Sequence, residues 1–271
     1  MSIGDRLKQW RRKICGWFGS STSGPPVVVV PPVTPPVQSG GEIRAHFLKG
    51  WNGGRCSLFW LSHKTTDAEF AEELAAHKAA GYNTAFVYLF NDKDGDGKHP
   101  VNVIEYMDLA DKRLAAISKA GLEIWAIVVA DDSAAITNAG PNALLAMFDK
   151  AAPLHHYFAG VVDGIELLES WRSAAKINTL GQGLHDRGFR VGHHTMPIRS
   201  ASDYGNCTSS WCDYAMIQAG SPFTRMSEAA CRKILADADN AIAATIVAFE
   251  QYVGLDGAKL GAEAGWACGN K

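Results

Sequence analysis

The amino-acid sequence predicts an α/β fold for the body of the chain, which starts at Glu42. Apolar, β-rich runs alternate with helical patterns, and several of these patterns end in a glycine just before the next run. About eight strands with intervening helices over roughly 230 residues match a (β/α)8 TIM barrel in count, order and length. An open doubly wound sheet also fits the alternation, but the chain has no glycine-rich phosphate turn after its first strand and no P-loop.

The expected strands are short runs rich in β-branched and aromatic residues. The first strand is either 45–51 or 56–62, and the sequence does not distinguish the two. The others span 83–90, 122–130, 160–168, 190–194, 212–218, 244–250 and 259–266. The helical patterns between them include 66–81, 104–121, 142–152 and 224–239.

An amphipathic anchoring helix is predicted over residues 1–20. Apolar side chains recur there at steps of three and four residues, which places them on one helical face with basic side chains around them. They are Ile3, Leu7, Trp10, Ile14 and Trp17. About two heptads are too few for a stable free coiled coil, so we expect the helix to dock on a protein partner, on copies of itself, or, through residues 3–18, on an anionic membrane surface. A disordered tail that contains tryptophans is the alternative.

A proline-rich linker is predicted over residues 21–41. Its prolines favour the polyproline II conformation and prevent sheet pairing, so the segment is expected to be a semi-rigid spacer. The composition changes abruptly at Glu42. The sequence therefore predicts three parts: the anchoring helix, the linker, and a barrel domain over 42–271.

The composition excludes some classes of partner. The chain has 271 residues, of which 47% are apolar, and a formal charge of −2, so it can build a full core. Residues 1–41 hold five basic side chains and one acidic one, which leaves the body with 21 basic and 27 acidic residues. This acidic body argues against a nucleic-acid partner. We also expect neither a transmembrane span nor a secretory signal peptide, because no apolar run of the required kind is found.

Polar and aromatic residues are expected at the carboxyl ends of the strands, where barrel enzymes have their active sites. The candidate substrate-binding residues are Trp51, Asn91, Asp131, His193, His194, Gln218 and Trp266, and the candidate catalytic residues are Glu166, Glu169 and Glu250. The set contains no lysine or arginine, which disfavours a phosphorylated substrate. Amides and carboxylates bind sugar hydroxyl groups and tryptophan stacks on sugar rings, so the set favours a carbohydrate.

On these residues the body resembles the (β/α)8-barrel glycoside hydrolases, in particular the cellulase-like members of clan A. In that clan a glutamate at the end of strand four is the acid/base, a glutamate at the end of strand seven is the nucleophile, and a tryptophan on strand eight lies under the sugar. The resemblance gives these roles to Glu169 or Glu166, to Glu250, and to Trp266. It implies a retaining mechanism with two glutamates and no cofactor.

Strand four departs from the cellulase-like pattern by one residue. That pattern, a glutamate, two apolar residues, an asparagine and a glutamate, puts Glu169 at the asparagine and Ser170 at the acid when it is laid on Glu166. A chitinase-like pattern, D-G-x-D-x-D-x-E, begins at Asp163 and also meets Ser170 at its last position. Ser170 is therefore the best support for a barrel without catalytic activity.

The orientation of the two glutamates depends on where strand four ends. In a strand that continues to Leu168, Glu166 points into the barrel, and Glu169 does so only if the strand ends or bulges just before it. The alternative without chemistry is that both carboxylates only pair with buried partners such as His193 or His194.

No metal is expected. The opening of a calcium loop is matched by Asp92, Asp94 and Asp96. The twelfth position of that loop is Val103, so a solvated acidic loop is favoured over bound calcium. His193 and His194 are adjacent on a strand and face opposite ways, so they cannot chelate one metal together. A metal-dependent barrel hydrolase would need a His-x-His on its first strand, which the sequence lacks.

The six cysteines show no CxxC spacing. Buried free thiols are the favoured interpretation. Two pairs are the disulfide alternatives: Cys56 with Cys268, near strands one and eight, and Cys207 with Cys212 within one loop.

The sequence predicts a glycoside hydrolase-like barrel that acts on a polysaccharide or a cell-wall glycan. The anchoring helix and linker are expected to tether it to a larger assembly, such as a virion or a cell surface. The alternative is a non-catalytic carbohydrate-binding or structural barrel in that assembly.

Overall fold

The computed structural model describes residues 57–79, 81–92, 99–130, 133–195, 201–219, 245–251 and 267–270. Contacts divide the chain into two units, Met1–Pro31 and Pro32–Lys271, and every described residue belongs to the second. The predicted anchoring helix and linker therefore lie outside the described residues.

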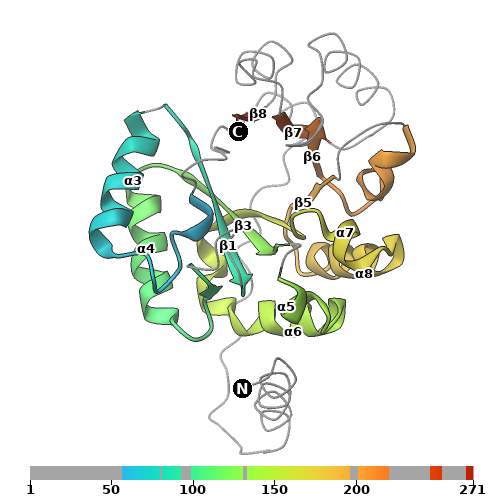
Figure 1. Cartoon of the computed structure of the whole chain (residues 1–271), viewed down its shortest axis with the longest axis horizontal. Helices are drawn as coiled ribbons and strands as arrows, with labels where there is room; N and C mark the ends of the chain where they lie inside the picture. Colours follow the sequence, from blue (N-terminus) through green and yellow to red (C-terminus); the bar gives the residue numbers. More distant parts are fainter. Residues whose placement is uncertain are drawn as a thin grey trace, which may run out of the picture. The chain divides into compact units, whose positions relative to one another are not determined.

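Strands and helices alternate along this part of the chain (Figure 1). The strands are β1 (Thr84–Asn91), β2 (Val101–Asn102), β3 (Glu123–Val129), β4 (Phe158–Val162), β5 (Val191–His194), β6 (Tyr214–Ala219), β7 (Thr245–Gln251) and β8 (Ala267–Asn270). The α-helices are α3 (Asp67–Ala79), α4 (Met107–Lys119), α5 (Ala134–Thr137), α6 (Pro141–Lys150), α7 (Leu167–Trp171) and α8 (Ala174–His185). The 3₁₀ helices are η1 (Ser57–Phe59), η2 (Ala152–Tyr157) and η3 (Ala201–Thr208).

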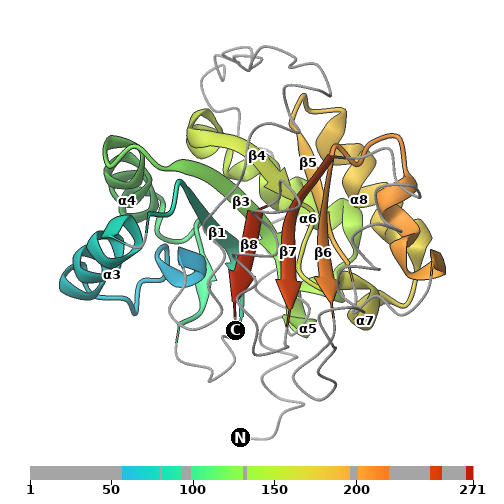
Figure 2. The ribbon, with the colours of Figure 1, turned by 90° about the horizontal axis from the view of Figure 1, so that it is seen from above.

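The strands form one sheet in the order β2-β1-β3-β4-β5-β6-β7-β8. The short β2 pairs antiparallel with β1, and all the other neighbouring pairs are parallel. Every residue of β1 is buried, as expected for a parallel sheet that is covered on both faces. Figure 2 shows α3, α4 and α8 on the outer side of the strands. This arrangement confirms the predicted α/β class.

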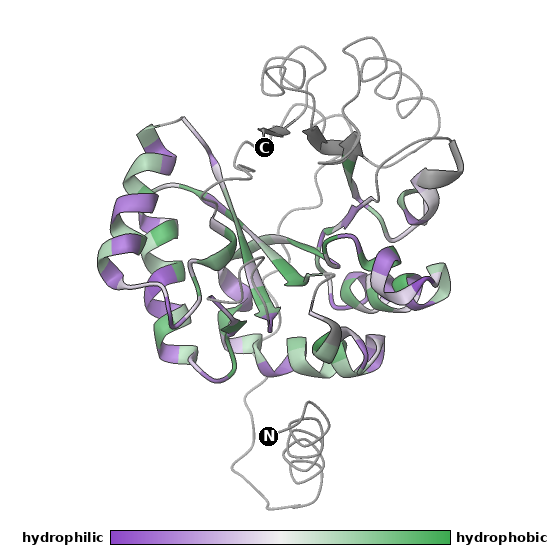
Figure 3. Ribbon diagram, viewed as in Figure 1, coloured by the Kyte–Doolittle hydropathy of each residue, from purple (hydrophilic) through white to green (hydrophobic). Residues whose placement is uncertain are grey.

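The longer helices pack on the sheet through one apolar stripe each. In α4, Ala110, Leu114 and Ile117 follow one another at steps of four and three residues and are fully buried. The helix α8 repeats this pattern between Ile177 and Leu184. Figure 3 shows the result: apolar colouring follows the strands, and hydrophilic colouring marks parts of the helices.

Most expected strands agree with the structure, and two differ. The alternative first strand at 56–62 is wrong, because Ser57–Phe59 is the 3₁₀ helix η1 and turns follow it. The other alternative, 45–51, lies outside the described residues, as does the expected strand 259–266, and β8 begins at Ala267. The expected strand 160–168 is wrong beyond Val162, where β4 ends. The helical patterns 66–81, 104–121 and 142–152 correspond to α3, α4 and α6.

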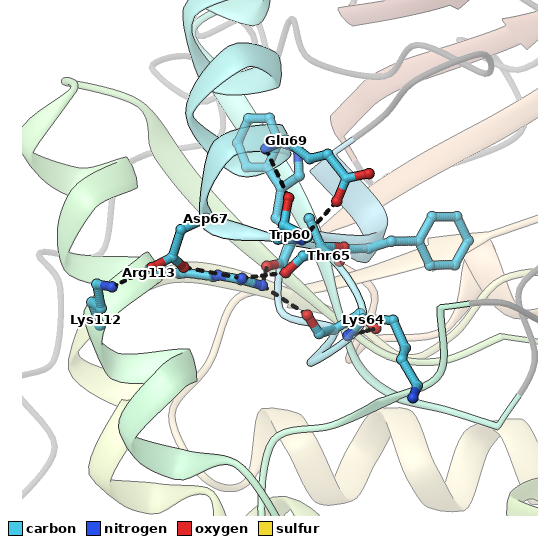
Figure 4. A network of polar contacts seen from close by, with 10 residues as sticks. Trp60, Lys64, Thr65, Asp67, Glu69, Lys112 and Arg113 are labelled. Carbon is cyan, nitrogen blue, oxygen red and sulfur yellow. Dashed lines mark hydrogen bonds and ion pairs between the residues drawn. The ribbon is translucent and has the colours of Figure 1, made fainter.

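A buried guanidinium group explains why residues 57–66 are wound into turns. Arg113 of α4 donates to the carbonyl oxygens of Trp60 at 2.6 Å and Ser62 at 2.7 Å, and also to that of Thr65 (Figure 4). In an extended strand the carbonyl groups of Trp60 and Ser62 would lie about 7 Å apart and that of Thr65 would point the opposite way, so one side chain could not bind all three. Asp67 lies 3.4 Å from Arg113 and also accepts a hydrogen bond from Lys112.

The turn segment also bonds to β1 directly. The hydroxyl of Ser57 accepts a hydrogen bond of 2.8 Å from the backbone N–H of Phe86. Further along the strand, β2 pairs with Phe90 and Asn91. These contacts satisfy backbone groups on the edge of β1 that does not face β3.

Among the described residues, no helix is both long enough and apolar enough to cross a membrane.

We expect Arg113→Met to lower the free energy of unfolding by at least about 3 kcal/mol, because it leaves buried carbonyl groups without donors. Lys112→Met is the matched control. Lys112 contacts the same Asp67 but its side chain is 67% exposed, against 3% for Arg113, so its loss should cost less than about 1 kcal/mol. Urea denaturation measures both. Equal losses for the two variants would contradict the structural role of Arg113.

Candidate active site

The carboxyl ends of β4 and β5 bring two titratable residues together. Asp163 directly follows β4, and His193 lies in β5, two strands that are neighbours in the sheet. The backbone N–H of Asp163 donates to the carbonyl of Gly192 at 3.0 Å, which continues the pairing one step past β4. The two side chains meet at 2.8 Å, between His193 Nδ1 and Asp163 Oδ2.

Both oxygen atoms of the Asp163 carboxylate have donors. Oδ2 accepts from the imidazole of His193, and Oδ1 accepts from the backbone N–H of Gly164 at 2.8 Å. Asp163 is fully buried, so these two hydrogen bonds replace the water that a carboxylate would otherwise bind. The carboxylate is held in one orientation.

The charge of Asp163 controls the protonation of His193. Burial alone lowers the pKa of His193, but the charge of Asp163 and the hydrogen bond to it, with a further contribution from Cys207, raise the pKa to about 9. His193 is therefore an imidazolium at neutral pH. Its ring also meets the ring of Trp211 edge-on, with 6.0 Å between centroids. The result is a buried ion pair and not a free general base.

The chain turns sharply after β4. A Cβ atom on Gly164 would lie 2.7 Å from the carbonyl oxygen of Val129 and 2.6 Å from Leu167, so only glycine fits there. Ile165 then donates its N–H to the same carbonyl at 3.0 Å. Glu166 follows with a φ of 48°, in the left-handed region, and α7 begins at Leu167. This turn ends the strand six residues before the expected position.

The turn decides where the candidate glutamates lie. Glu166 is the N-cap residue of α7 and is half-buried, whereas Glu169 and Ser170 lie within α7 and are exposed. Neither glutamate belongs to a strand. Both follow the carboxyl end of β4, at the edge of the sheet where a barrel has its active site.

A second polar group lies at the ends of β1 and β3. The side chain of Asn91, the last residue of β1, is hydrogen-bonded to the hydroxyl of Ser133, and both residues are buried. The hydroxyl of Ser133 also accepts from the backbone N–H of Asp92 at 3.3 Å. Asp131, predicted at this place, lies outside the described residues.

The remaining candidates lie in β5, β6 and β7 or outside the described residues. Gln218 of β6 and Glu250 of β7 are opposite one another in the parallel ladder, and Glu250 is also opposite Gly269 of β8. His194 is buried in β5, next to His193. Trp51 and Trp266 lie outside the described residues, and the side chains of Gln218 and Glu250 are not described.

Three residues of the site, Asp163, Ser133 and Trp211, are given no role by the sequence patterns for catalytic glutamates. For Asp163 a signal exists: an aspartate and a glycine directly after an apolar strand, with two histidines at the end of the next one. For Ser133 and Trp211 no local pattern identifies a role, because their partners are distant in the sequence.

The structure gives no support for a metal site within the described segments. There, no three side chains of histidine, cysteine, aspartate or glutamate are grouped so that they could hold a metal ion. The calcium-loop residues Asp94 and Asp96 lie outside those segments. Cys207 and Cys212 are buried free thiols, and Cys56 is not described.

Comparison with solved structures finds proteins of similar fold, among them a glycoside hydrolase. Gas2p from Saccharomyces cerevisiae, in complex with laminaritetraose and laminaripentaose, matches with a TM-score of 0.54 and 12% identity over 83% of this chain and 55% of its own. A glycoside hydrolase family 5 protein from Bacteroides vulgatus matches with a TM-score of 0.53 and 14% identity over 76% and 55%. These matches confirm the predicted (β/α)8 fold.

The likeness does not extend to the sequence. No protein-family model matches the chain, and no curated protein matches it in sequence. The chain also spans only about half the length of the solved structures that it matches. The comparisons therefore show the fold alone.

The ion pair predicts a pH dependence of stability. Because the pKa of His193 is raised to about 9 in the folded protein, its contribution should be complete below pH 6.5 and lost as the pH rises through about 9. We expect the difference in unfolding free energy between the wild type and His193→Gln to fall by up to about 3 kcal/mol over this range. Urea denaturation at several pH values measures it.

His77→Gln is a control of opposite sign. Burial lowers the pKa of His77, so its contribution should be present at high pH and lost as the pH falls below 6.5. The same pH trend in both variants would contradict the ion pair between His193 and Asp163.

Proposed function

We propose that the protein is a glycoside hydrolase that acts on a polysaccharide or a cell-wall glycan by a retaining mechanism with two glutamates. The observation that supports this most is the parallel sheet, in which β4 and β7 end at the same edge. The turn after β4 carries Glu166 and Glu169, and Glu250 is the last residue but one of β7. Carboxylates at these two places are what the mechanism requires.

The ion pair removes Asp163 from the candidates for the general acid and leaves Glu166 and Glu169. Asp163 is the carboxylate nearest to the end of β4, but both of its oxygen atoms already accept hydrogen bonds, from His193 and from Gly164, so we do not assign it the role of the acid. Of the two glutamates, Glu166 is half-buried and Glu169 is exposed. A general acid needs partly apolar surroundings, so Glu166 fits the role better than Glu169.

In this proposal Glu250 attacks the anomeric carbon while the acid protonates the glycosidic oxygen, and water then hydrolyses the glycosyl-enzyme intermediate. Retention requires the two carboxyl groups to be about 5 to 5.5 Å apart. Trp266 would form the floor of the sugar site. The other proposed substrate contacts are Trp51, Asn91, Asp131, His193, His194 and Gln218.

A β-glucan is the first substrate to test, since the similar Gas2p structures contain laminari-oligosaccharides. Our second candidate is a non-catalytic carbohydrate-binding or structural barrel. The observation that favours it is the exposure of Glu169 and Ser170 on α7, where the cellulase-like pattern has its asparagine and acid.

We further propose that residues 1–20 dock the barrel, through linker 21–41, to a larger assembly such as a virion or a cell surface. The support is the one-faced apolar stripe of the helix and the proline-rich spacer behind it.

We expect Glu250→Gln to lower kcat on a soluble glucan by at least about 10³-fold, because the nucleophile is lost. Glu166→Gln should lower it by about 10²- to 10⁴-fold, since protonation of the leaving group is lost. On an aryl glycoside whose leaving group needs no proton, Glu166→Gln should be much less impaired than Glu250→Gln. Release of reducing sugar from a panel that includes laminarin measures the first effect, and NMR of the first anomer formed measures retention.

The matched control is Glu72→Gln, a change on the exposed face of α3 that should leave kcat unaltered. If Glu169→Gln shows the leaving-group dependence and Glu166→Gln does not, then Glu169 is the acid. Glycan binding by the wild type without any release of reducing sugar would support the non-catalytic candidate instead.

Removal of residues 1–31 should leave the unfolding midpoint and any glycan hydrolysis unchanged, because the described fold belongs to the unit that begins at Pro32. The truncated protein should lose self-association or binding to vesicles of anionic lipid, whichever the full chain shows. Size-exclusion chromatography and vesicle sedimentation measure these properties. Aggregation or unfolding of the truncated protein would mean that the N-terminal segment belongs to the core.

A further inference from the structure

Two thiols next to the ion pair have no role in the proposed hydrolysis. Cys207 lies in η3, after β5, and Cys212 lies two residues before β6. Both side chains are buried, with residue exposures of 1% and 6%. Between them the chain returns to the surface, where Thr208 and Ser210 are exposed. The two buried cysteines therefore lie on either side of a short surface segment, residues 208–210.

The thiols contact one another. Cys212 is hydrogen-bonded to Cys207, and its sulfur also lies 3.3 Å from the carbonyl oxygen of Tyr214. A thiol has one proton, so Cys212 shares it between these two acceptors. Formation of a disulfide would bring these two sulfur atoms from hydrogen-bond contact to the S–S bonding distance of about 2 Å.

The surroundings give the two thiols different roles. The hydrogen bond from Cys212 lowers the pKa of Cys207, burial and Asp163 oppose this, and the positive charge of His193 supports it. The pKa of Cys212 is raised, because it acts as the donor to Cys207 and is buried. Cys207 is therefore the thiol that more readily becomes the nucleophilic thiolate, and Cys212 is the one that keeps its proton.

We propose that Cys207 and Cys212 form a reversible oxidation site for a small hydroperoxide. The thiolate of Cys207 attacks a peroxide oxygen, the O–O bond breaks, and a sulfenic acid and hydroxide are formed. The sulfur of Cys212 then attacks the sulfenic sulfur, the S–S bond forms, and a second hydroxide leaves. The two thiol protons convert the hydroxides to water, so two thiols supply two electrons to one hydrogen peroxide molecule.

Burial determines which oxidant fits. A bulky disulfide such as oxidised glutathione would have to reach a sulfur that is almost fully covered, whereas hydrogen peroxide is close to water in size. In this proposal hydrogen peroxide reaches the thiols past residues 208–210, of which Thr208 and Ser210 are exposed. This site does not depend on the proposed hydrolase activity.

Oxidation of the two thiols should also change the pKa of His193, near the end of β5. Cys207 contributes to the raised pKa of His193, and a neutral disulfide cannot do so. The pKa of His193 should therefore be lower in the oxidised protein than in the reduced one. The ion pair with Asp163 remains, so the change is a shift and not a loss.

The sequence allows a direct test by peptide mapping. Trypsin releases residues 200–225 as one peptide that contains Cys207 and Cys212 and no other cysteine. The full chain is treated with hydrogen peroxide, denatured in an alkylating agent and digested. We expect this peptide to be unalkylated and lighter by two hydrogen atoms, and to regain two alkyl groups if the protein is first reduced with dithiothreitol.

Two single variants separate the roles of the thiols. In Cys212→Ser, Cys207 should stop at the sulfenic acid, which dimedone labels. In Cys207→Ser, oxidation of Cys212 should be at least about tenfold slower than that of Cys207. NMR titration of the His193 ring before and after oxidation gives the second readout in the wild type.

The proposal is overturned if both cysteines of the wild-type peptide are alkylated after peroxide treatment. It is equally overturned if they are found only as sulfinic acids or in disulfides between two chains. Equal oxidation rates in the two single variants would remove the distinction between Cys207 and Cys212. An unchanged pKa of His193 after oxidation would contradict the proposed effect of Cys207 on His193.

Discussion

The ion pair between Asp163 and His193 is the interaction on which the described end of the sheet depends. A carboxylate without water is costly, and Asp163 is fully buried. The structure meets this cost with one charged partner from β5 and one backbone donor from the following residue. Loss of His193 would leave Asp163 as an uncompensated buried charge, and loss of Asp163 would remove the main cause of the positive charge on His193. The position of β5 beside β4 and the turn after β4 are thus coupled to one electrostatic requirement.

The same pair limits the chemistry that this edge of the sheet can perform. An imidazolium whose pKa is about 9 cannot accept a proton at neutral pH, and a carboxylate that accepts two hydrogen bonds is a poor proton donor. Proton transfer must therefore come from residues outside the pair. The nearest carboxylates along the chain, Glu166 and Glu169, are in the turn and in α7, outside the strands. The ion pair holds the ends of β4 and β5 together, and the turn after β4 and the helix α7 carry the candidate catalytic glutamates.

The sequence predicts the α/β class and most strands because burial and periodicity are local properties. It fails where a distant partner decides the conformation. Residues 56–62 have the apolar composition of a strand, but the carbonyl groups of Trp60 and Ser62 bind Arg113, about fifty residues away in the sequence. The run from Gly160 to Leu168 also has the composition of a strand, but Gly164 approaches the backbone of β3 too closely for any other residue. The partner of Asp163 is thirty positions distant, so the aspartate after one strand and the two histidines of the next are the only signal, and they do not say that Asp163 pairs with His193.

The early end of β4 changes how a glycosidase would have to work in this fold. A glutamate on a strand is fixed by the sheet, whereas Glu166 is fixed by a left-handed backbone conformation and by the start of a helix of five residues. Such a conformation is strained for a residue other than glycine, and strain of this kind is retained where the surrounding structure enforces it. Buried Leu167 on one side and the hydrogen bond of Ile165 to β3 on the other supply that constraint. A sugar bound over this turn would remove water from the half-buried carboxyl group, so substrate binding itself would create the apolar surroundings that a general acid needs.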